Sequence, residues 1–166
     1  GELEAGDAGN KGQVGSYSRL LVPIVDIDQE LRKVDTLIHA EDRMKAWPEA
    51  LAIVRNKKYD KIEFKKVFNA YGDNIYYSDP DRANLYLGGG ATPKSEQSLA
   101  YLLRNEILTN IEDLRAELEY LLKSGENEVE DLYSFSKVIT ETMTRYLALV
   151  PPKELEEARG FLKGVS

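Results

Sequence analysis

A glycine-rich run is the first segment of this chain whose residue types suggest chemistry. Residues 88 to 95 read G-G-G-A-T-P-K-S, which matches the phosphate-loop pattern G-x-x-x-x-G-K-S at every fixed position except one. Such a loop follows a strand and holds phosphates with backbone N–H groups. Pro93 replaces the second glycine and has no N–H, and no strand is predicted before it. We interpret the run as a glycine hinge, with Thr92 and Pro93 beginning a helix.

The single histidine is the next candidate, as a metal or haem ligand. A di-iron site in a helical bundle needs Glu-x-x-His on two helices, but Thr36 lies three residues before His39. A haem held by His39 and Met143 would need both at one iron, and the helices predicted below place them roughly 20 Å apart. The chain also has no cysteine. We therefore expect no cofactor and no metal, and we expect His39 to lie exposed at a helix end, where a cation suits the helix dipole.

The sequence shows no recognisable spacing of catalytic residues. No serine or threonine can be paired with a histidine base at a recognisable spacing, because only one histidine exists. Acidic residues are abundant, at 29 of 166, so a catalytic pair of carboxylates stays open, although no spacing marks one. We predict that the protein is not an enzyme.

Segregated charge indicates binding instead. Residues 55 to 66 hold six basic and two acidic side chains, a local net charge of +4 in a chain of −7. Residues 112 to 131 hold eight acidic and two basic side chains, a local charge of −6. The overall charge argues against general nucleic-acid binding. Two solvated helix faces are the alternative explanation. The basic residues that we predict to bind a partner are Arg55, Lys57, Lys58, Lys61, Lys65 and Lys66.

Tyrosines provide a second candidate surface. Four of the ten gather near the end of the second predicted helix, at Tyr71, Tyr76, Tyr77 and Tyr86. Tyrosine suits the wet edge of a core and a protein interface equally well. We predict that Tyr76, Tyr77 and Tyr86 bind a partner, and the edge of the core remains the alternative.

The elements that must position these residues are helices. Apolar residues recur in steps of four and three between residues 20 and 38, and again within 107 to 121 and 132 to 146. Seams of this kind belong to helices that are buried against other helices. The residues expected in the core are Leu20, Ile24, Leu31, Val34, Ile107, Leu114, Leu118, Leu132 and Ile139.

The expected fold is all-α, an up-down-up-down four-helix bundle over residues 16 to 150. Its second helix opens at residues 47 to 49 and carries Ile62 among its apolar residues, with a potential break at 56 to 60. Gly125 stands where a left-handed residue ends the third helix. Residues 1 to 15 are expected to form a flexible glycine-rich N-terminal tail. Residues 151 to 166 are expected to hold a short C-terminal helix, packed through Leu155, Ala158 and Leu162. The longest apolar run is six residues, so no membrane span is expected, since that needs about 20.

Several of these features resemble one known family. The chain resembles the PsbQ-like extrinsic subunits of photosystem II in three segments. These are residues 45 to 48 (K-A-W-P) at the start of the second predicted helix, the tyrosine-rich end of that helix, and the leucine-rich third helix. The acidic balance and residues 76 to 84 (Y-Y-S-D-P-D-R-A-N) are more similar to algal members. These are PsbQ-prime and the related four-helix extrinsic subunit of diatoms. The likeness covers roughly residues 16 to 150, and a glycine-rich tail replaces the proline-rich arm of the plant subunit.

The resemblance implies a location and a set of partners. It places the protein in the chloroplast thylakoid lumen of an alga, peripheral to the membrane through contacts with intrinsic and other extrinsic subunits of photosystem II. There it would stabilise the oxygen-evolving complex and help to retain calcium and chloride, without catalysis of its own. The alternatives are a soluble helical-bundle adaptor or signalling protein unrelated to photosynthesis and, less well supported by the ligand count, a metal or haem carrier.

Overall fold

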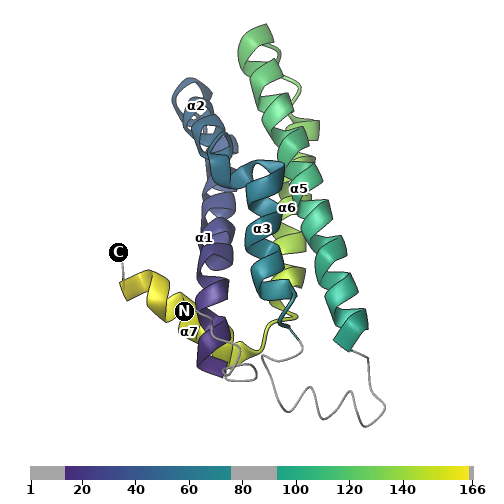
Figure 1. Cartoon of the computed structure of the whole chain (residues 1–166). Coiled ribbons are helices and arrows are strands. Elements are labelled where there is room, and N and C mark those ends of the chain that lie inside the picture. Colours follow the sequence, from purple (N-terminus) through teal and green to yellow (C-terminus); the bar gives the residue numbers. More distant parts are fainter. Residues whose placement is uncertain (1–13, 76–92, 165–166) are drawn as a thin grey trace.

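The segments with helical apolar spacing form helices in the structure, which is a computed structural model. It describes residues 14–75 and 93–164. Within those ranges there is no strand, so the prediction of an all-helical protein is confirmed (Figure 1). The helices are α1 (Val14–Ile38), α2 (Arg43–Val54), α3 (Lys61–Gly72), α5 (Pro93–Ser124), α6 (Glu130–Leu147) and α7 (Pro152–Gly164), with a 3-10 turn, η2 (Lys57–Tyr59), between α2 and α3. The predicted flexible tail over residues 1 to 15 lies outside the described residues except where α1 begins at Val14.

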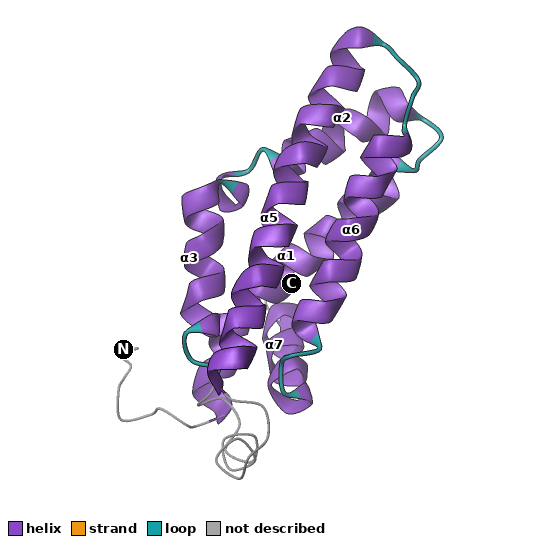
Figure 2. Ribbon diagram, turned by 90° about the vertical axis from the view of Figure 1, so that its right-hand side faces the viewer, coloured by secondary structure: helices purple, strands orange, loops and turns teal. Residues whose placement is uncertain are grey.

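The long helices α1, α5 and α6 lie side by side, as Figures 1 and 2 show from two directions. Helix α6 packs against both α1 and α5, and the pair α2 and α3 contacts the same two helices. Helices α5 and α6 are joined at Gly125, whose φ of 74° is the left-handed conformation predicted for it. Helix α7 packs against α1.

The second predicted helix is interrupted at the place where its apolar rhythm fails. Its predicted start at residue 47 is wrong, because α2 begins at Arg43 and Pro48 lies inside it. Helix α2 ends at Val54, and α3 begins at Lys61. Between them Asn56 is extended, with φ −61° and ψ 144°, and its side chain accepts a hydrogen bond of 3.0 Å from the backbone N–H of Lys58. Asparagine commonly caps a turn in this way, because its short side chain competes with helical hydrogen bonding. The potential break at residues 56 to 60 is therefore present.

The core contains the predicted seams with one exception. The buried members are Ile24, Leu31, Val34, Ile107, Leu114, Leu118, Leu132 and Ile139, all at most 2% exposed. The prediction for Leu20 is wrong, because Leu20 is only partly buried and Leu21, three residues before Ile24, takes its place. Steps of three and four both occur along a helical stripe, so a seam followed backwards from Ile24 could reach either residue.

Aromatic residues fill the centre of the molecule between α3 and α6. The ring centroids of Phe64 and Phe68 are 4.5 Å apart, and Phe68 meets Tyr146 of α6 edge-on at 5.1 Å. Both arrangements are favourable for aromatic rings. Because Phe64, Phe68 and Tyr146 are at most 1% exposed, they fix which face of α3 points inward.

Helix α7 is held by a buried carboxyl group as well as by apolar contact. Ala158 is fully buried, and Leu155 and Leu162 are partly buried. Glu154 is also fully buried and accepts a hydrogen bond of 3.2 Å from the hydroxyl of Tyr71 on α3. In the described part of the chain, no helix combines the length and the apolar character needed to cross a membrane.

We expect Leu114→Ala to lower the free energy of unfolding by about 2–5 kcal/mol, the usual cost of truncating a buried leucine. Leu114 is 1% exposed on α5. The matched control is Leu102→Ala on the same helix, where the side chain is 66% exposed and a change within about 0.5 kcal/mol is expected. Urea unfolding measures both, and equal effects would show that the seam of α5 is misplaced.

Candidate functional site

Two of the six basic residues predicted to bind a partner are engaged within the molecule. Lys58 Nζ lies 2.9 Å from Asp26 Oδ2 and 2.9 Å from Glu30 Oε2, both on α1. The Arg55 guanidinium donates two hydrogen bonds, of 2.7 and 3.1 Å, to Glu119 Oε2 on α5. The two side chains therefore point to different neighbouring helices, and each forms an ion pair there.

The Lys58 contact is part of a network that also includes a buried tyrosine. The Tyr59 hydroxyl donates a hydrogen bond of 2.7 Å to Glu30 Oε1, and Tyr59 is fully buried. Burial and this hydrogen bond raise the pKa of Tyr59 above its usual value. Burial alone would lower the pKa of Lys58, but its hydrogen bonds to Glu30 and Asp26 outweigh burial and raise the pKa. Both groups thus keep their protons in the folded protein, and together they tie η2 to α1.

The other four lysines remain available to a partner. Lys57, Lys61, Lys65 and Lys66 take part in none of the ion pairs formed among the described residues. Lys65 is partly buried, and the other three are exposed. All four lie on η2 or α3, where Asp60 and Glu63 are the only acidic residues between them. We call these four residues the lysine surface.

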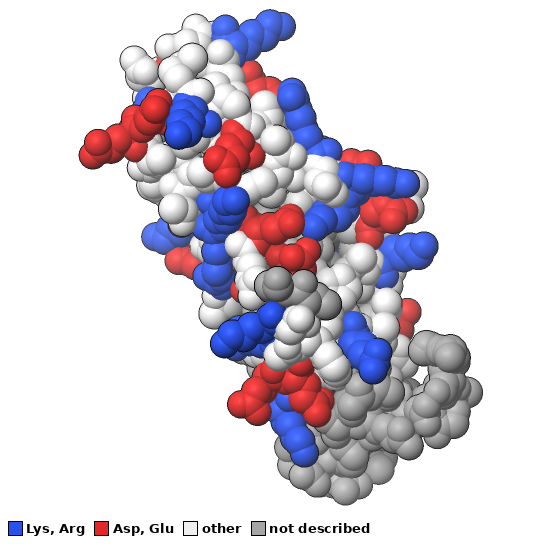
Figure 3. Space-filling view, turned by 90° about the vertical axis from the view of Figure 1, so that its left-hand side faces the viewer, with Lys and Arg blue, Asp and Glu red and all other residues white. Residues whose placement is uncertain are grey.

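Charge is arranged differently on another face of the protein. On the face seen in Figure 3, basic and acidic side chains are interspersed over the part of the surface that belongs to described residues. Neighbouring charges of opposite sign cancel at short range, so such a face exerts little net attraction on a partner. The lysine surface differs because four lysines lie within ten residues of the chain, with only Asp60 and Glu63 as acidic residues between them.

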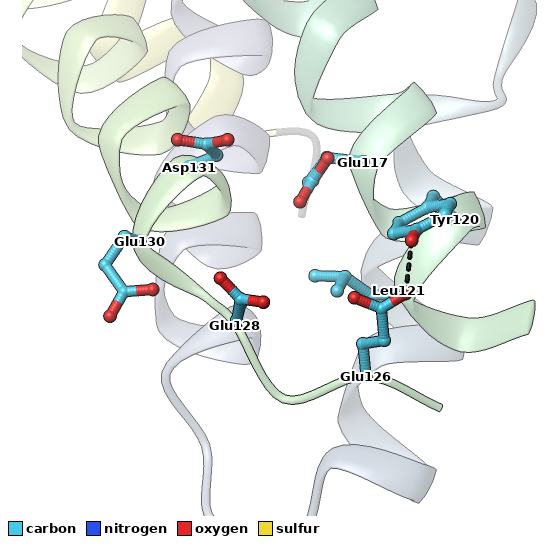
Figure 4. A pocket seen from close by; sticks show the side chains of 7 residues that line it. All are labelled: Glu117, Tyr120, Leu121, Glu126, Glu128, Glu130 and Asp131. Carbon is cyan, nitrogen blue, oxygen red and sulfur yellow. Dashed lines mark hydrogen bonds between the residues drawn. The ribbon is translucent and has the colours of Figure 1, made fainter. Parts of the chain in front are cut away.

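An acidic pocket marks the end of the molecule where α5 turns into α6. It encloses about 300 Å³ and is lined by Glu117, Tyr120, Leu121, Glu126, Glu128, Glu130 and Asp131. Figure 4 shows Glu117 of α5 and Glu128 of the connection directed toward the same space. The Tyr120 hydroxyl donates a short hydrogen bond to Glu126. Partial burial, together with Asp131 and Glu126, raises the pKa of Glu117.

The pocket concentrates negative charge without the geometry of a metal site. No group of three or more His, Cys, Asp or Glu side chains is placed to hold a metal ion anywhere in residues 14–75 and 93–164. Burial and, to a smaller extent, the charges of Asp131 and Glu126 raise the pKa of Glu117, so its ionised form is disfavoured there. The pocket therefore presents concentrated negative charge, which attracts basic groups and disfavours the approach of acidic ones.

His39 forms a contact between helices at the same end of the molecule. It follows the last residue of α1, and its side chain is 46% exposed. The imidazole stacks on the ring of Tyr133 from α6, with centroids 4.1 Å apart, and its Nδ1 lies 2.7 Å from the carbonyl oxygen of Asp35. Met143 is fully buried. The exposed helix-end position predicted for His39 is present, and the stacking on Tyr133 is an addition that sequence spacing did not show.

Of the four tyrosines gathered near the end of the second predicted helix, one lies in the core and three lie outside the residues that the structure describes. Tyr71 is fully buried beside Glu154, so it belongs to the core. Tyr76, Tyr77 and Tyr86 lie outside the described residues. The surface residue that sequence reasoning missed is Ile62, which was counted among the apolar residues of the second helix but is 78% exposed on α3. Its position directly after Lys61 was the sequence feature that could have indicated an exposed side chain.

We expect Tyr59→Phe to change how stability depends on alkaline pH. An unfolded tyrosine ionises near pH 10.0, whereas folded Tyr59 holds its proton to higher pH, so the wild type should lose stability as pH rises above about 10. Phenylalanine has no such proton, but it lacks the hydrogen bond to Glu30, which should cost about 1.5–3 kcal/mol at pH 7. The two stability curves, measured by urea unfolding from pH 7 to 11, should therefore converge at high pH. Parallel curves would contradict the Tyr59–Glu30 network.

We expect Glu117→Gln to stabilise the protein at neutral pH. The raised pKa of Glu117 means that its ionised form is disfavoured in the fold, so stability is greater below its unfolded pKa and declines as pH rises through the folded pKa. Glutamine removes the repulsion from Asp131 and Glu126. The free energy of unfolding should rise at pH 7 and be nearly unchanged near pH 3. Glu156→Gln, on the exposed side of α7, is the control and should change little at either pH.

Comparisons with known proteins add no family to this geometry. A scan against models of protein families, a search of curated proteins and a search of solved structures each give no match to the chain. The site must therefore be interpreted from its own residues. The lysine surface and the acidic pocket are the two features that distinguish it, and both are suited to contact with charged surfaces.

Proposed function

We propose that this protein is a non-catalytic subunit that docks through its lysine surface on an acidic face of a larger protein complex. The observation that carries the proposal is the group of four lysines on η2 and α3 that lack ion-pair partners in the described structure, in a chain whose net charge is −7. Diffuse repulsion keeps an acidic protein away from an acidic partner. A compact opposite patch overcomes it locally and sets the orientation of the encounter.

The rigid frame behind the lysine surface supports this role. We propose that α1, the pair α2 and α3, α5 and α6 act as the four arms of an up-down-up-down bundle. The inner face of α3 is fixed by Phe64 and Phe68, and its start is fixed by Tyr59 and Lys58. A surface held on such a helix needs little ordering when it binds, which lowers the entropic cost of association.

The complex that we propose as the partner is photosystem II, on its lumenal side. The support is the K-A-W-P segment, which has a definite structural task. The indole N–H of Trp47 donates a hydrogen bond of 3.1 Å to the carbonyl oxygen of Ile38. Arg43 lies over the Trp47 ring, 5.0 Å from its centroid. The segment thus fixes the corner between α1 and α2, and the choice of photosystem II rests on the resemblance of this segment to PsbQ-like subunits.

Under this proposal the protein resides in the thylakoid lumen of an algal chloroplast, peripheral to the membrane. It contacts intrinsic and other extrinsic subunits of photosystem II and stabilises the oxygen-evolving complex, helping to retain calcium and chloride. Its own residues need supply only the contact, because retention of ions by a covering subunit requires no ligand from that subunit. No enzymatic step is assigned to it.

The test is rebinding to photosystem II membranes from which extrinsic subunits have been removed by a salt wash. A variant with Lys57, Lys61, Lys65 and Lys66 changed to Gln should bind at least about fourfold more weakly, since exposed ion pairs contribute about 0.2–1 kcal/mol each. Lys58 is left intact because it holds η2 on α1. Oxygen evolution should recover with the wild type more than with this variant.

The control for that experiment carries the same change in charge at four exposed lysines on other elements, Lys45, Lys123, Lys137 and Lys153. It should rebind like the wild type. If the two variants rebind equally, the lysine surface is only a solvated helix face. If the wild type itself does not bind the washed membranes, the assignment to photosystem II is wrong, and the adaptor or signalling role becomes the better explanation.

A further inference from the structure

One large apolar side chain of α3 lies on the wrong side of the helix for a core residue. Phe64, Phe68 and Tyr71 are at most 1% exposed and belong to the core, whereas Ile62 is 78% exposed. Ile62 precedes Phe64 by two positions, which is about 200° around a helix, so it points away from the core. Single exposed apolar residues are common on protein surfaces. Ile62 therefore becomes informative only through the residues that surround it.

Its neighbours on the helix surface belong to the lysine surface. Lys66 lies one turn after Ile62 on the same outer face, Lys65 lies three residues after it, and Lys61 directly precedes it. Residues three and four apart on a helix are neighbours on its surface. The arrangement, an apolar side chain bordered by cations without ion-pair partners in the described structure, is the anatomy of a protein interface with an apolar centre and a polar rim.

We infer that Ile62 is the apolar anchor of the docking surface, and that the partner presents an apolar recess bordered by carboxylates. The inference rests on the proposed docking role, and it adds the chemistry of the partner's surface. Charge complementarity favours an acidic partner, because three lysines border Ile62 (Lys61, Lys65 and Lys66) against one acidic neighbour, Glu63. A partner offering carboxylates alone would satisfy the lysines and leave Ile62 in water.

The exposed Met44 provides an internal contrast. It is 80% exposed at the start of α2, so it matches Ile62 in exposure. Its charged neighbours in sequence are balanced, with the acidic Glu41 and Asp42 against the basic Arg43 and Lys45. A mixed surrounding gives no preference for an acidic or a basic partner. Met44 should therefore not act as an anchor for an acidic surface.

The anchor and the lysines should control different steps of binding. Charges at the rim of an interface act mainly on the association rate and on its dependence on salt. A buried apolar side chain acts mainly on the dissociation rate, since it is desolvated only in the docked complex. Substituting Ile62 should therefore accelerate dissociation and leave the salt dependence unchanged, while substituting the lysines should do the reverse.

The experiment measures binding of the purified chain to two immobilised polymers, poly-L-glutamate and a random copolymer of glutamate and tyrosine. The wild type should bind the copolymer more tightly than poly-L-glutamate. Ile62→Ser should abolish that preference through dissociation that is faster by about tenfold or more, with the same slope against salt concentration. Ile62→Leu should restore the preference, and Met44→Ser should keep it. Circular dichroism confirms that each variant is folded.

Three results would overturn the inference: no preference of the wild type for the copolymer, an unchanged preference in Ile62→Ser, or an equal loss in Met44→Ser. Washed photosystem II membranes form the second arm, in which Ile62→Ser should dissociate faster than the wild type. If the wild type fails to bind these membranes but prefers the copolymer through Ile62, the photosystem assignment fails and the anchor stands. If the wild type binds the membranes and Ile62→Ser dissociates at the same rate, the docking role stands and the anchor fails.

Discussion

The placement of η2 and α3 depends on one group, the carboxylate of Glu30 on α1. It accepts hydrogen bonds from the Tyr59 hydroxyl and the Lys58 ammonium, so it holds η2 against α1 at the point where the chain changes direction. With η2 fixed, α3 must present Phe64 and Phe68 to the core, and the opposite face, with Ile62 and Lys66, must face outward. Without Glu30, the hydroxyl of the fully buried Tyr59 would lose its hydrogen-bond acceptor, which is costly, so this contact favours the observed placement of η2.

The all-helical class could be predicted because spacing along the sequence is a local property. Steps of three and four are typical of a buried helix, and eight of the nine residues that they placed in the core are buried, Ile24 and Leu114 among them. Leu20 was misplaced because two adjacent leucines both fit a stripe that is wider than one residue. The cap at Asn56 could also be anticipated, since it acts over two residues. Local sequence patterns are therefore enough to predict the helices and the break between α2 and α3.

The candidate site was less predictable because its charges are assigned by contacts between distant segments. Arg55 pairs with Glu119, which is 64 residues away, and Lys58 pairs with Glu30, which is 28 residues away. A run of basic residues in the sequence gives no sign of which members will be neutralised in this way. The inward face of α3 could be inferred from Phe64 and Phe68, and once it is known the outward position of Ile62 follows. Tertiary pairing thus reduced a six-residue cluster to four available cations.

The docking of α7 on α1 has a consequence for the way the chain reaches its folded state. Helix α1 ends at Ile38 and α7 begins only at Pro152, and the hydrogen bond that joins Tyr71 of α3 to Glu154 of α7 spans 83 residues. Contacts of such separation raise the contact order and slow the final steps of folding. During synthesis the apolar side of α1 that α7 covers must wait for α7 to emerge from the ribosome. Until then that side of α1 is a surface that a chaperone can recognise.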